Sequence, residues 1–222
     1  MLAVLYDIHG NLPALEAVLD DARAAGAEGF VLGGDYCVFG PWPAETLERL
    51  QALPGATWIR GNTERELLGE DDLCDGAFVW ARELLGRERI EWLHALPEQV
   101  AFGGELFCHA SPLADDETFG PEPRPDDERL LAGERRRTIV FGHSHVQFCR
   151  PGPDETELVN PGSVGRPRDG DRRAAWALRS PDGTIELRRT EYDVDAVVAR
   201  LRELGIAWAD DAAGVIELAD RG

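Results

Sequence analysis

The sequence predicts an α/β protein with two β-sheets and helices outside them. In the first 145 residues, short apolar runs that end in polar turns alternate with amphipathic stretches, which is typical of strands followed by helices. From Glu157 onward, apolar runs are joined by hairpin turns, which indicates further strands that form a second sheet packed on the first. A chain of 222 residues suits one domain, so we expect a single domain over residues 1–222.

The first strand and the first helix are predicted on either side of the segment Asp7-Ile8-His9-Gly10-Asn11. The apolar run at residues 2–6 precedes this segment and favours a buried strand. The stretch that follows has Pro13 in its first turn and apolar residues at helical spacing, which favours a helix. Asp7 and His9 therefore project from the carboxyl end of a strand, where ligands bind in open α/β sheets.

The same arrangement of an apolar run followed by a polar turn recurs four more times. The runs at residues 30–32, 57–59, 105–108 and 138–141 lead into Gly34-Asp35, Gly61-Asn62, His109 and Gly142-His143-Ser144-His145. If the five strands share one sheet, their carboxyl ends meet at one edge and seven side chains converge there. These side chains are Asp7, His9, Asp35, Asn62, His109, His143 and His145.

The segments between and after these strands complete the predicted fold. We expect helices over residues 44–53, 64–69, 76–85 and 88–96. The stretch 112–128 is rich in Pro, Asp and Glu, and predicts a long loop near the site, either a lid or a plain surface excursion. We expect strands at 157–159, 174–178 and 184–187, a hairpin turn at Pro181-Asp182-Gly183, and a closing helix over 194–204.

The charge of the chain restricts its partners. A formal net charge of −19 repels nucleic acid and anionic membranes, so we expect neither as the main partner, although the charge has a simpler explanation in solubility. The sequence has neither a signal-like N-terminus nor a run of 18 apolar residues, which favours a cytoplasmic protein. Four scattered cysteines without a C-x-x-C pair are expected to be free thiols: Cys37, Cys74, Cys108 and Cys149.

Four of the five histidines lie at the strand ends, and this concentration favours a metal site. The fifth, His94, lies in a predicted helix, where a packed or capping role is expected. A single strand-end histidine could simply form a hydrogen bond in a turn, but four of them with two Asp and one Asn favour metal binding. Imidazole and carboxylate ligands without a neighbouring thiolate suit divalent first-row metals, namely Mn, Fe, Zn, Co or Ni.

A pair of such ions would account for a set of seven ligands. Two ions about 3.5–4 Å apart share a bridging carboxylate and water, lower the pKa of the water, and clamp the oxygens of a phosphoryl group. Their positive charge would attract a phosphate despite the negative charge of the whole chain.

In order and spacing, these blocks resemble the five-block signature of calcineurin-like metallophosphoesterases. The blocks are Asp7-x-His9, Gly34-Asp35, Gly61-Asn62, His109 and Gly142-His143-x-His145. Residues 160–171 further resemble the small bacterial and archaeal phosphodiesterase-like branch labelled YfcE-like or MJ0936-like. The resemblance covers residues 2–190, nearly the whole chain.

The resemblance implies a fold, a ligand set and a reaction. The fold would be a four-layer α/β/β/α sandwich of two mixed sheets flanked by helices. Asp7, His9 and His145 would hold one metal ion and Asn62, His109 and His143 a second, with Asp35 bridging them. A metal-bridged hydroxide, with Mn as the first choice of metal, would attack phosphorus while Asn62 and His109 lie near the phosphoryl oxygens.

Position 63 departs from the pattern of the family. Many members have His after the Gly-Asn pair, where it is proposed to contact the phosphate or protonate the leaving group, and this chain has Thr63. Thr63-Glu64-Arg65-Glu66 fits a capping box, in which Thr63 caps a helix and Glu66 reaches back. Thr63 thus leaves the general acid unassigned and remains a candidate for contact with the substrate.

Arg166 and Arg168 are further candidates for contact with the substrate. Both lie in the segment that resembles the phosphodiesterase-like branch. Either guanidinium could hold a phosphate bidentately, or both could pair with Asp169 and Asp171 instead.

We therefore expect a metal-dependent phosphoesterase that acts on a small phosphodiester or phosphomonoester, with nucleotides among the candidates. A serine/threonine protein phosphatase is an alternative. A non-catalytic metal-binding scaffold or ligand sensor is another, although such a protein should have lost ligands and all seven are present. A nuclease is disfavoured because the chain has no basic patch. Nothing in the sequence indicates an oligomeric state.

Overall fold

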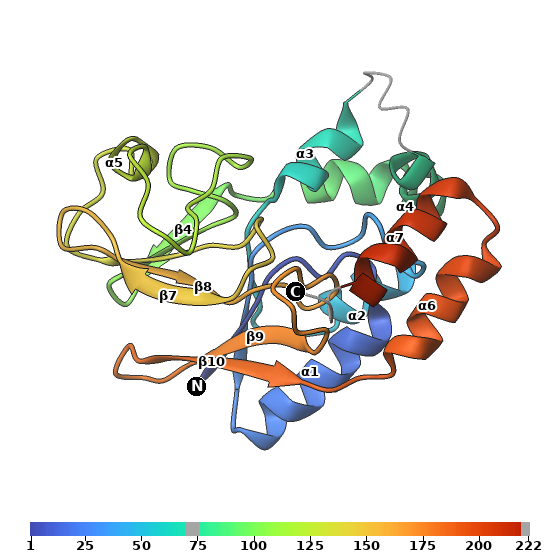
Figure 1. Ribbon diagram of the computed structural model, residues 1–222, viewed down its shortest axis with the longest axis horizontal. Coiled ribbons are helices and arrows are strands. Elements are labelled where there is room, and N and C mark those ends of the chain that lie inside the picture. The colour runs from blue at the N-terminus through green and yellow to red at the C-terminus, as the bar shows by residue number, and fades with distance from the viewer. Residues whose placement is uncertain (70–75, 219–222) are drawn as a thin grey trace.

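Two five-stranded sheets lie face to face in the computed structural model, which describes residues 1–69 and 76–218 (Figure 1). Cys74 lies outside these residues. The strands are β1 (Leu2–Leu5), β2 (Gly29–Leu32), β3 (Thr57–Trp58), β4 (Gln99–Phe102), β5 (Glu105–Cys108), β6 (Thr138–Val140), β7 (Phe148–Pro151), β8 (Glu157–Asn160), β9 (Ala174–Arg179) and β10 (Ile185–Thr190). The helices are α1 (Leu12–Ala24), α2 (Pro43–Gln51), α3 (Asn62–Leu68), α4 (Gly76–His94), α5 (Asp127–Leu130), α6 (Val194–Glu203) and α7 (Ala207–Leu218).

Both sheets are mixed. The first has the order β10-β9-β1-β2-β3, in which β1, β2 and β3 are parallel and β9 runs antiparallel to both β1 and β10. The second has the order β4-β5-β6-β8-β7, in which β5, β6 and β8 are parallel and the two edge strands are antiparallel. The predicted fold class is therefore confirmed.

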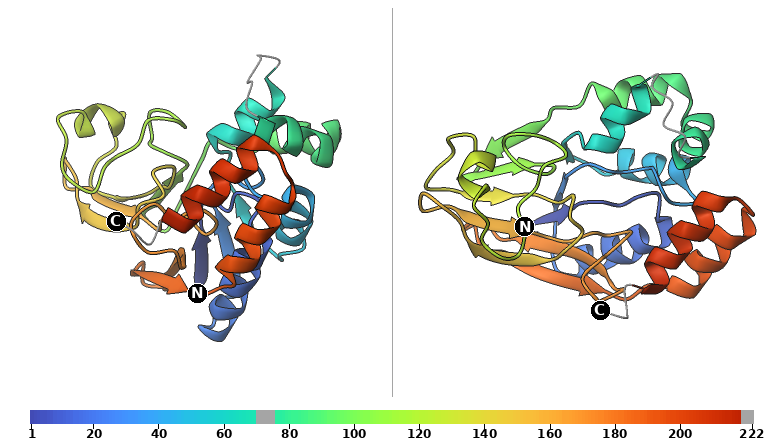
Figure 2. Two further views of the ribbon diagram at one scale, coloured as in Figure 1. Left: turned by 45° about the vertical axis from the view of Figure 1, so that its right-hand side comes forward. Right: turned by 45° about the horizontal axis from the view of Figure 1, so that its top comes forward.

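The layers arise because successive side chains of a strand point to opposite faces of its sheet. Leu5 of β1 packs against the helices that cover the first sheet, whereas Val4 of β1 and Tyr6, directly after it, face the second sheet. The outer face of the second sheet packs against α5 and the loop before it, through Phe119 and Leu130. Figure 2 shows the same order of layers from two further sides, with α6 and α7 side by side.

Local chemistry explains where two of the helices begin and break. Asn11 precedes α1, and its side-chain oxygen accepts a hydrogen bond from the backbone N–H of Ala14 at 3.2 Å, while Pro13 lies in the first turn. In α4, Gly86 has a φ of 72° and interrupts the helix. The two helices predicted over 76–85 and 88–96 are thus confirmed as two helical halves joined at this glycine.

Two expectations about the sheets are wrong. The five ligand-bearing strands do not share one sheet, because β1, β2 and β3 belong to the first and β5 and β6 to the second. The later strands do not form the second sheet by themselves either: β8 joins β6, while the hairpin β9–β10 extends the first sheet beside β1. All six residues of β9 are buried, so its apolar pattern does not indicate which neighbour it pairs with.

The structure also contains elements that the sequence did not predict. The helix expected over 194–204 is confirmed as α6 but does not close the chain, since α7 follows and packs on it through alanines such as Ala209 and Ala213. The edge strands β4 and β7 were missed because one is largely exposed and the other ends in Pro151. No helix in the described part of the chain is long and apolar enough to cross a membrane.

Candidate metal centre

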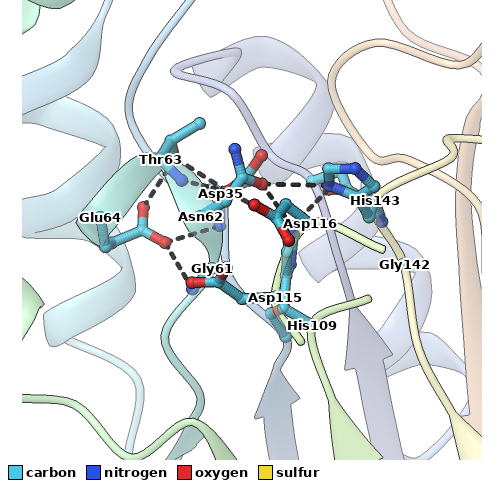
Figure 3. Close-up of polar contacts among 12 residues, drawn as sticks. Asp35, Gly61, Asn62, Thr63, Glu64, His109, Asp115, Asp116, Gly142 and His143 are labelled. Atoms are coloured by element: carbon cyan, nitrogen blue, oxygen red, sulfur yellow. Dashed lines mark hydrogen bonds and ion pairs between the residues drawn. The ribbon is translucent and has the colours of Figure 1, made fainter. Parts of the chain in front are cut away.

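The structure brings all seven candidate ligands together at one end of the two sheets. Asp7 and His9 follow β1, and Asp35 follows β2. Asn62 opens α3, while the three other histidines follow β5 and β6. Figure 3 shows Asp35, Asn62 and the His109 and His143 rings gathered at this point. Their convergence is thus a property of the fold, while their roles as metal ligands remain a prediction.

Hydrogen bonds fix the protonation of three imidazole rings. The Nδ1 atoms of His9, His109 and His145 lie 2.9, 2.8 and 2.7 Å from backbone carbonyl oxygens. Because a carbonyl oxygen only accepts, each Nδ1 must carry the proton and donate it. The neutral rings therefore present an unprotonated Nε2 toward the centre, which is the form that binds a metal ion.

A first group of acceptor atoms lies around His9 and His145. The two Nε2 atoms are 3.1 Å apart, although neither carries a proton to share. Asp35 Oδ2 lies 3.7 Å from the Nε2 of His9, and Asp7 Oδ1 lies 3.6 Å from that of His145. Asp7 Oδ1 is buried and accepts no hydrogen bond from any described residue. These four residues, whose ligand atoms lie within 4.8 Å of one another, fit a divalent cation.

A second group lies on the other side of Asp35. Asn62 Oδ1 is 3.1 Å from His109 Nε2 and 3.0 Å from His143 Nδ1. The amide nitrogen of Asn62 donates to Glu66 at 3.3 Å, which turns Oδ1 toward the two rings. Asp35 Oδ1 lies 3.4 Å from His109 Nε2. The two oxygens of one carboxylate therefore face the two groups, as a bridging ligand would.

Burial sets the ionisation of the centre. Loss of solvent raises the pKa of Asp7 well above its ordinary value, and the neighbouring Asp35 carboxylate adds to this. Burial likewise raises the pKa of Asp35 to about 6. It lowers the pKa of His9 and His145 well below the ordinary value, which keeps both rings neutral. A buried cation would favour the charged carboxylates while accepting the lone pairs of the neutral rings.

The candidate ligands have an unusual backbone. Among the described residues, ten other than glycine have a positive φ, and five of those ten are candidate ligands. These five, with φ between 50° and 65°, are Asp7, His9, Asp35, His143 and His145. Such conformations cost on the order of 1–3 kcal/mol each and persist only where the surroundings hold them. Strained backbone is thus concentrated at this centre.

Two glycines leave room for the close approach of these loops. A Cβ atom at Gly142 would lie 2.5 Å from Asp7 Oδ2, and one at Gly34 would lie 2.7 Å from His109 Nδ1. Gly34 also has a φ of 98°. A larger residue at either position would displace a candidate ligand.

Glu64 holds two loops of the centre together, and the sequence analysis missed it. Its buried carboxylate accepts hydrogen bonds from the backbone N–H groups of Asp35, Tyr36 and Gly61 at 2.8, 2.9 and 2.9 Å. One side chain therefore joins the loop after β2 to the start of α3. Burial raises its pKa to about 7, although the three backbone bonds oppose the shift.

The predicted capping box is accordingly wrong. Gly61 is the N-cap of α3, and Glu64, three residues later, is the acid that reaches back, not Glu66. Thr63 lies inside the helix, and its hydroxyl donates to Asp35 Oδ1 at 2.9 Å. The spacing of Glu64 from Gly61 would have predicted this, but glycine has no side chain to complete the pattern.

The two arginines occupy different positions. Arg166 is buried, with its guanidinium carbon 4.7 Å from the centre of the Phe39 ring, while Arg168 is exposed. The alternative pairing with Asp169 and Asp171 is wrong. Those two carboxylates pair with other arginines, namely Arg189 and Arg173. A phosphate-binding role for Arg166 and Arg168 remains a prediction.

The remaining expectations concern the surroundings of the centre. The loop over 112–128 does lie beside it, since Asp115 binds Arg65 of α3 through two hydrogen bonds of 2.8 and 2.9 Å. Asp116 also lies within 3.3 Å of Arg65, and the charges of Asp115 and Asp116 oppose the lowering of the His143 pKa by burial. Figure 3 shows both residues at the centre. His94 lies at the far end of α4, where its carbonyl accepts from Arg60.

Comparisons with known proteins agree with this geometry. The family model described as a calcineurin-like phosphoesterase superfamily domain matches residues 1–180. The chain is 31% identical over 219 residues to the uncharacterized protein MJ0912 of Methanocaldococcus jannaschii, covering 87% of this chain and 88% of that protein. It is 30% identical over 204 residues to phosphodiesterase YfcE of Escherichia coli K12, covering 87% and 94%. The crystal structure of a metallophosphoesterase from Sphaerobacter thermophilus superposes with a TM-score of 0.82 at 26% identity, covering 98% and 99%.

Replacement of Glu64 should loosen both loops that it joins. In Glu64→Gln, an amide NH₂ would face backbone donors that need an acceptor, and each unsatisfied group costs about 1–3 kcal/mol. We expect the free energy of unfolding, measured by urea denaturation, to fall by about 3 kcal/mol. The matched control is Glu66→Gln, at a half-buried position, which should change it by less than about 1 kcal/mol. Equal effects of the two substitutions would contradict the role of Glu64.

Added metal should stabilise the protein more at neutral than at acidic pH. The raised pKa of Asp35 means that its contribution to metal-free stability is complete below pH 3.8 and is lost as pH rises through about 6. A cation must displace that proton, so it binds poorly below pH 6. Thermal melts with and without MnCl₂ should give a Tm increase at about pH 7.5 that exceeds the increase at about pH 5. An increase that is constant or larger in acid would contradict this assignment.

Proposed function

The chain belongs to the calcineurin-like phosphoesterase superfamily, and from that premise we propose that it is a dinuclear metal-dependent hydrolase of small phosphodiesters or phosphomonoesters. The observation that carries the proposal is the contact of two unprotonated imidazole nitrogens at 3.1 Å between two buried carboxylates. Without a cation, such a group of acceptors must take up protons to relieve its repulsion, and one divalent ion satisfies all four side chains at once. All seven ligand positions have a residue that can bind a metal ion, which disfavours a non-catalytic scaffold.

The ligands divide between two ions. Asp7, His9 and His145 would hold the first, while Asn62, His109 and His143 would hold the second, with Asp35 shared. We propose Mn²⁺ first, and Fe, Zn, Ni or Co as alternatives, because imidazole and carboxylate ligands suit all of them. When bound, two such ions activate water and neutralise the charge on phosphoryl oxygens.

The residues of this chain orient the centre and set the direction of approach. Of the seven candidate ligands, only Asn62 and His143 are partly exposed, so the centre opens to solvent beside these two side chains. Asn62 and His109 would then lie beside the phosphoryl oxygens. The backbone carbonyls that hold three of the imidazole rings keep the lone pairs aimed while the substrate enters.

Two observations narrow the substrate: one concerns the class of ester and the other concerns the leaving group. The Escherichia coli relative is a phosphodiesterase by name, which favours diesters. Thr63 cannot act as an imidazole acid, and its hydroxyl already donates to Asp35. A leaving group that departs without protonation is therefore favoured, whichever class of ester is bound.

Metal content and the shared carboxylate test the proposal together. The purified protein, reconstituted with Mn or Zn, should hold close to two ions per chain by elemental analysis. Asp35→Asn removes the shared charge, so it should lower metal content and reduce turnover on a phosphoester panel by about 10³-fold or more, with the fold retained by circular dichroism. His94→Ala is the control and should keep both ions and the activity. A metal content well below one ion in the wild type would overturn the proposal.

The absence of an imidazole at position 63 should appear in the choice of leaving group. A general acid contributes about 10²–10⁴-fold and matters most for basic leaving groups. We therefore expect aryl phosphates and phosphoanhydrides to be hydrolysed faster than alkyl phosphates. Thr63→His should flatten the dependence of rate on leaving-group pKa and cost about 1 kcal/mol of stability, because the hydroxyl bond to Asp35 is lost.

The matched control for this series is Thr63→Ser. Serine keeps the hydroxyl that donates to Asp35 and adds no acid, so the slope of the series should stay at its wild-type value. A wild-type rate that does not depend on leaving-group pKa would show that the proton comes from elsewhere or that chemistry is not rate-limiting.

A further inference from the structure

A large apolar groove lies between α4 and α7. Its volume is about 1170 Å³, which is the size of a site for a small organic ligand. Apolar side chains dominate its walls, including Val79 and Trp80 on α4 and Trp208 and Val215 on α7. Val79 is 48% exposed, so the groove opens to solvent along this side.

The inner end of the groove lies one layer of side chains from the candidate metal centre. Phe39 and Arg166 both line it. The Phe39 ring centre lies 5.8 Å from that of His9, and the carbonyl of Arg166 accepts the Nδ1–H of His145 at 2.7 Å. A ligand that fills the groove would therefore end beside two candidate metal ligands.

One wall of the groove lies outside the family domain. The matched region ends at residue 180, whereas α6 and α7 span residues 194–218. Of the two, α7 packs against α4, and Figure 2 shows both helices apart from the second sheet. The groove thus lies partly outside the region that the family model matches, although the Sphaerobacter thermophilus structure superposes over 98% of the chain.

The chemistry of the groove selects a flat and uncharged ligand. The rings of Trp80 and Trp208 lie 6.4 Å apart at 45°, and both indole Nε1 atoms are shielded from water without an acceptor among the described residues. Indole rings stack on flat aromatic groups, so the two tryptophans suit a flat ligand. Three acidic residues also line the groove, namely Glu83, Glu203 and Asp211, and they repel further phosphates.

We propose that this groove binds the nucleoside portion of a phosphoester whose phosphate lies at the candidate metal centre. A nucleobase is flat, uncharged and rich in acceptors, and a single phosphate attached to it would lie at the inner end, beside Arg166. The position of the phosphate rests on the proposed function, whereas the affinity of the groove for a nucleoside does not.

Two diesters with the same leaving group test the proposal. Thymidine 5′-(p-nitrophenyl phosphate) and methyl p-nitrophenyl phosphate carry the same charge and release the same phenolate, so they differ only in the nucleoside. Stacking of a base on an aromatic side chain contributes about 1–3 kcal/mol, so the thymidine ester should have a KM lower by about tenfold or more. Trp208→Ala should bring the ratio of the two KM values toward one.

Two further variants keep this test decisive. Val79→Glu alters the groove from an exposed position, where folding is not at risk, and should also bring the KM ratio toward one. Trp92→Ala is the matched control, because Trp92 is a 39% exposed tryptophan of α4 that packs on Trp58 and does not line the groove. It should leave the ratio at the wild-type value. Equal KM values for the two esters in the wild type would overturn the proposal.

A binding measurement separates this inference from the proposed function. If neither ester is hydrolysed, the diesterase form of the proposed function fails, and the groove is then tested by equilibrium dialysis with thymidine 5′-monophosphate and ribose 5-phosphate. We expect binding of the nucleotide to be about tenfold tighter in the wild type and in Trp92→Ala but not in Trp208→Ala. Equal binding would overturn the proposal. A dimer in light scattering that Val79→Glu converts to monomer would assign the groove to a second copy of the chain and overturn it too.

Discussion

The fold must hold a group of electron-pair donors together against their mutual repulsion. Two carboxylates and two unprotonated imidazole nitrogens share a space in which the two nitrogens are 3.1 Å apart. All four side chains are buried, so water does not screen them and the low local dielectric strengthens the repulsion. The hydrogen bonds around the centre therefore act to keep these groups in place until a cation compensates them.

The scaffold meets this constraint by joining its two sheets directly behind the centre. Tyr6 precedes Asp7, and its hydroxyl donates to the carbonyl of Val140 in the facing sheet at 3.0 Å. Asn160 donates to the carbonyl of Gly142 at 2.8 Å, which holds the loop after β6. The Tyr6 bond joins the two sheets and the Asn160 bond holds the loop after β6, so the loops after β1 and β6 can adopt left-handed backbone and still converge. Contacts at the interface between the sheets thus compensate for the strained backbone of the candidate ligands.

Local features of the chain were predictable, and long-range pairings were not. Proline and glycine fixed the start of α1 and the break at Gly86, and the position of each polar group after an apolar run predicted the seven candidate ligands. The assignment of strands to sheets could not be inferred in the same way. A strand that is buried on both faces is apolar throughout, so its sequence does not indicate which strands it pairs with. The role of Glu64 was hidden for a related reason. Two of its three backbone partners lie about thirty residues earlier.

In the proposed function, chemistry and substrate recognition are assigned to different parts of this chain. The candidate ligands lie in short loops after strands of the family domain, where any shift would disturb the whole group. The helices α6 and α7 have their own cluster of buried side chains, which includes Val197 and Leu201, and α7 meets the rest of the molecule through α4. Substitutions on the groove side of α7 can therefore change which ligand is held without moving a candidate ligand. A helical wall that packs apart from the candidate metal ligands would let substitutions change the bound ligand while the reaction stays the same.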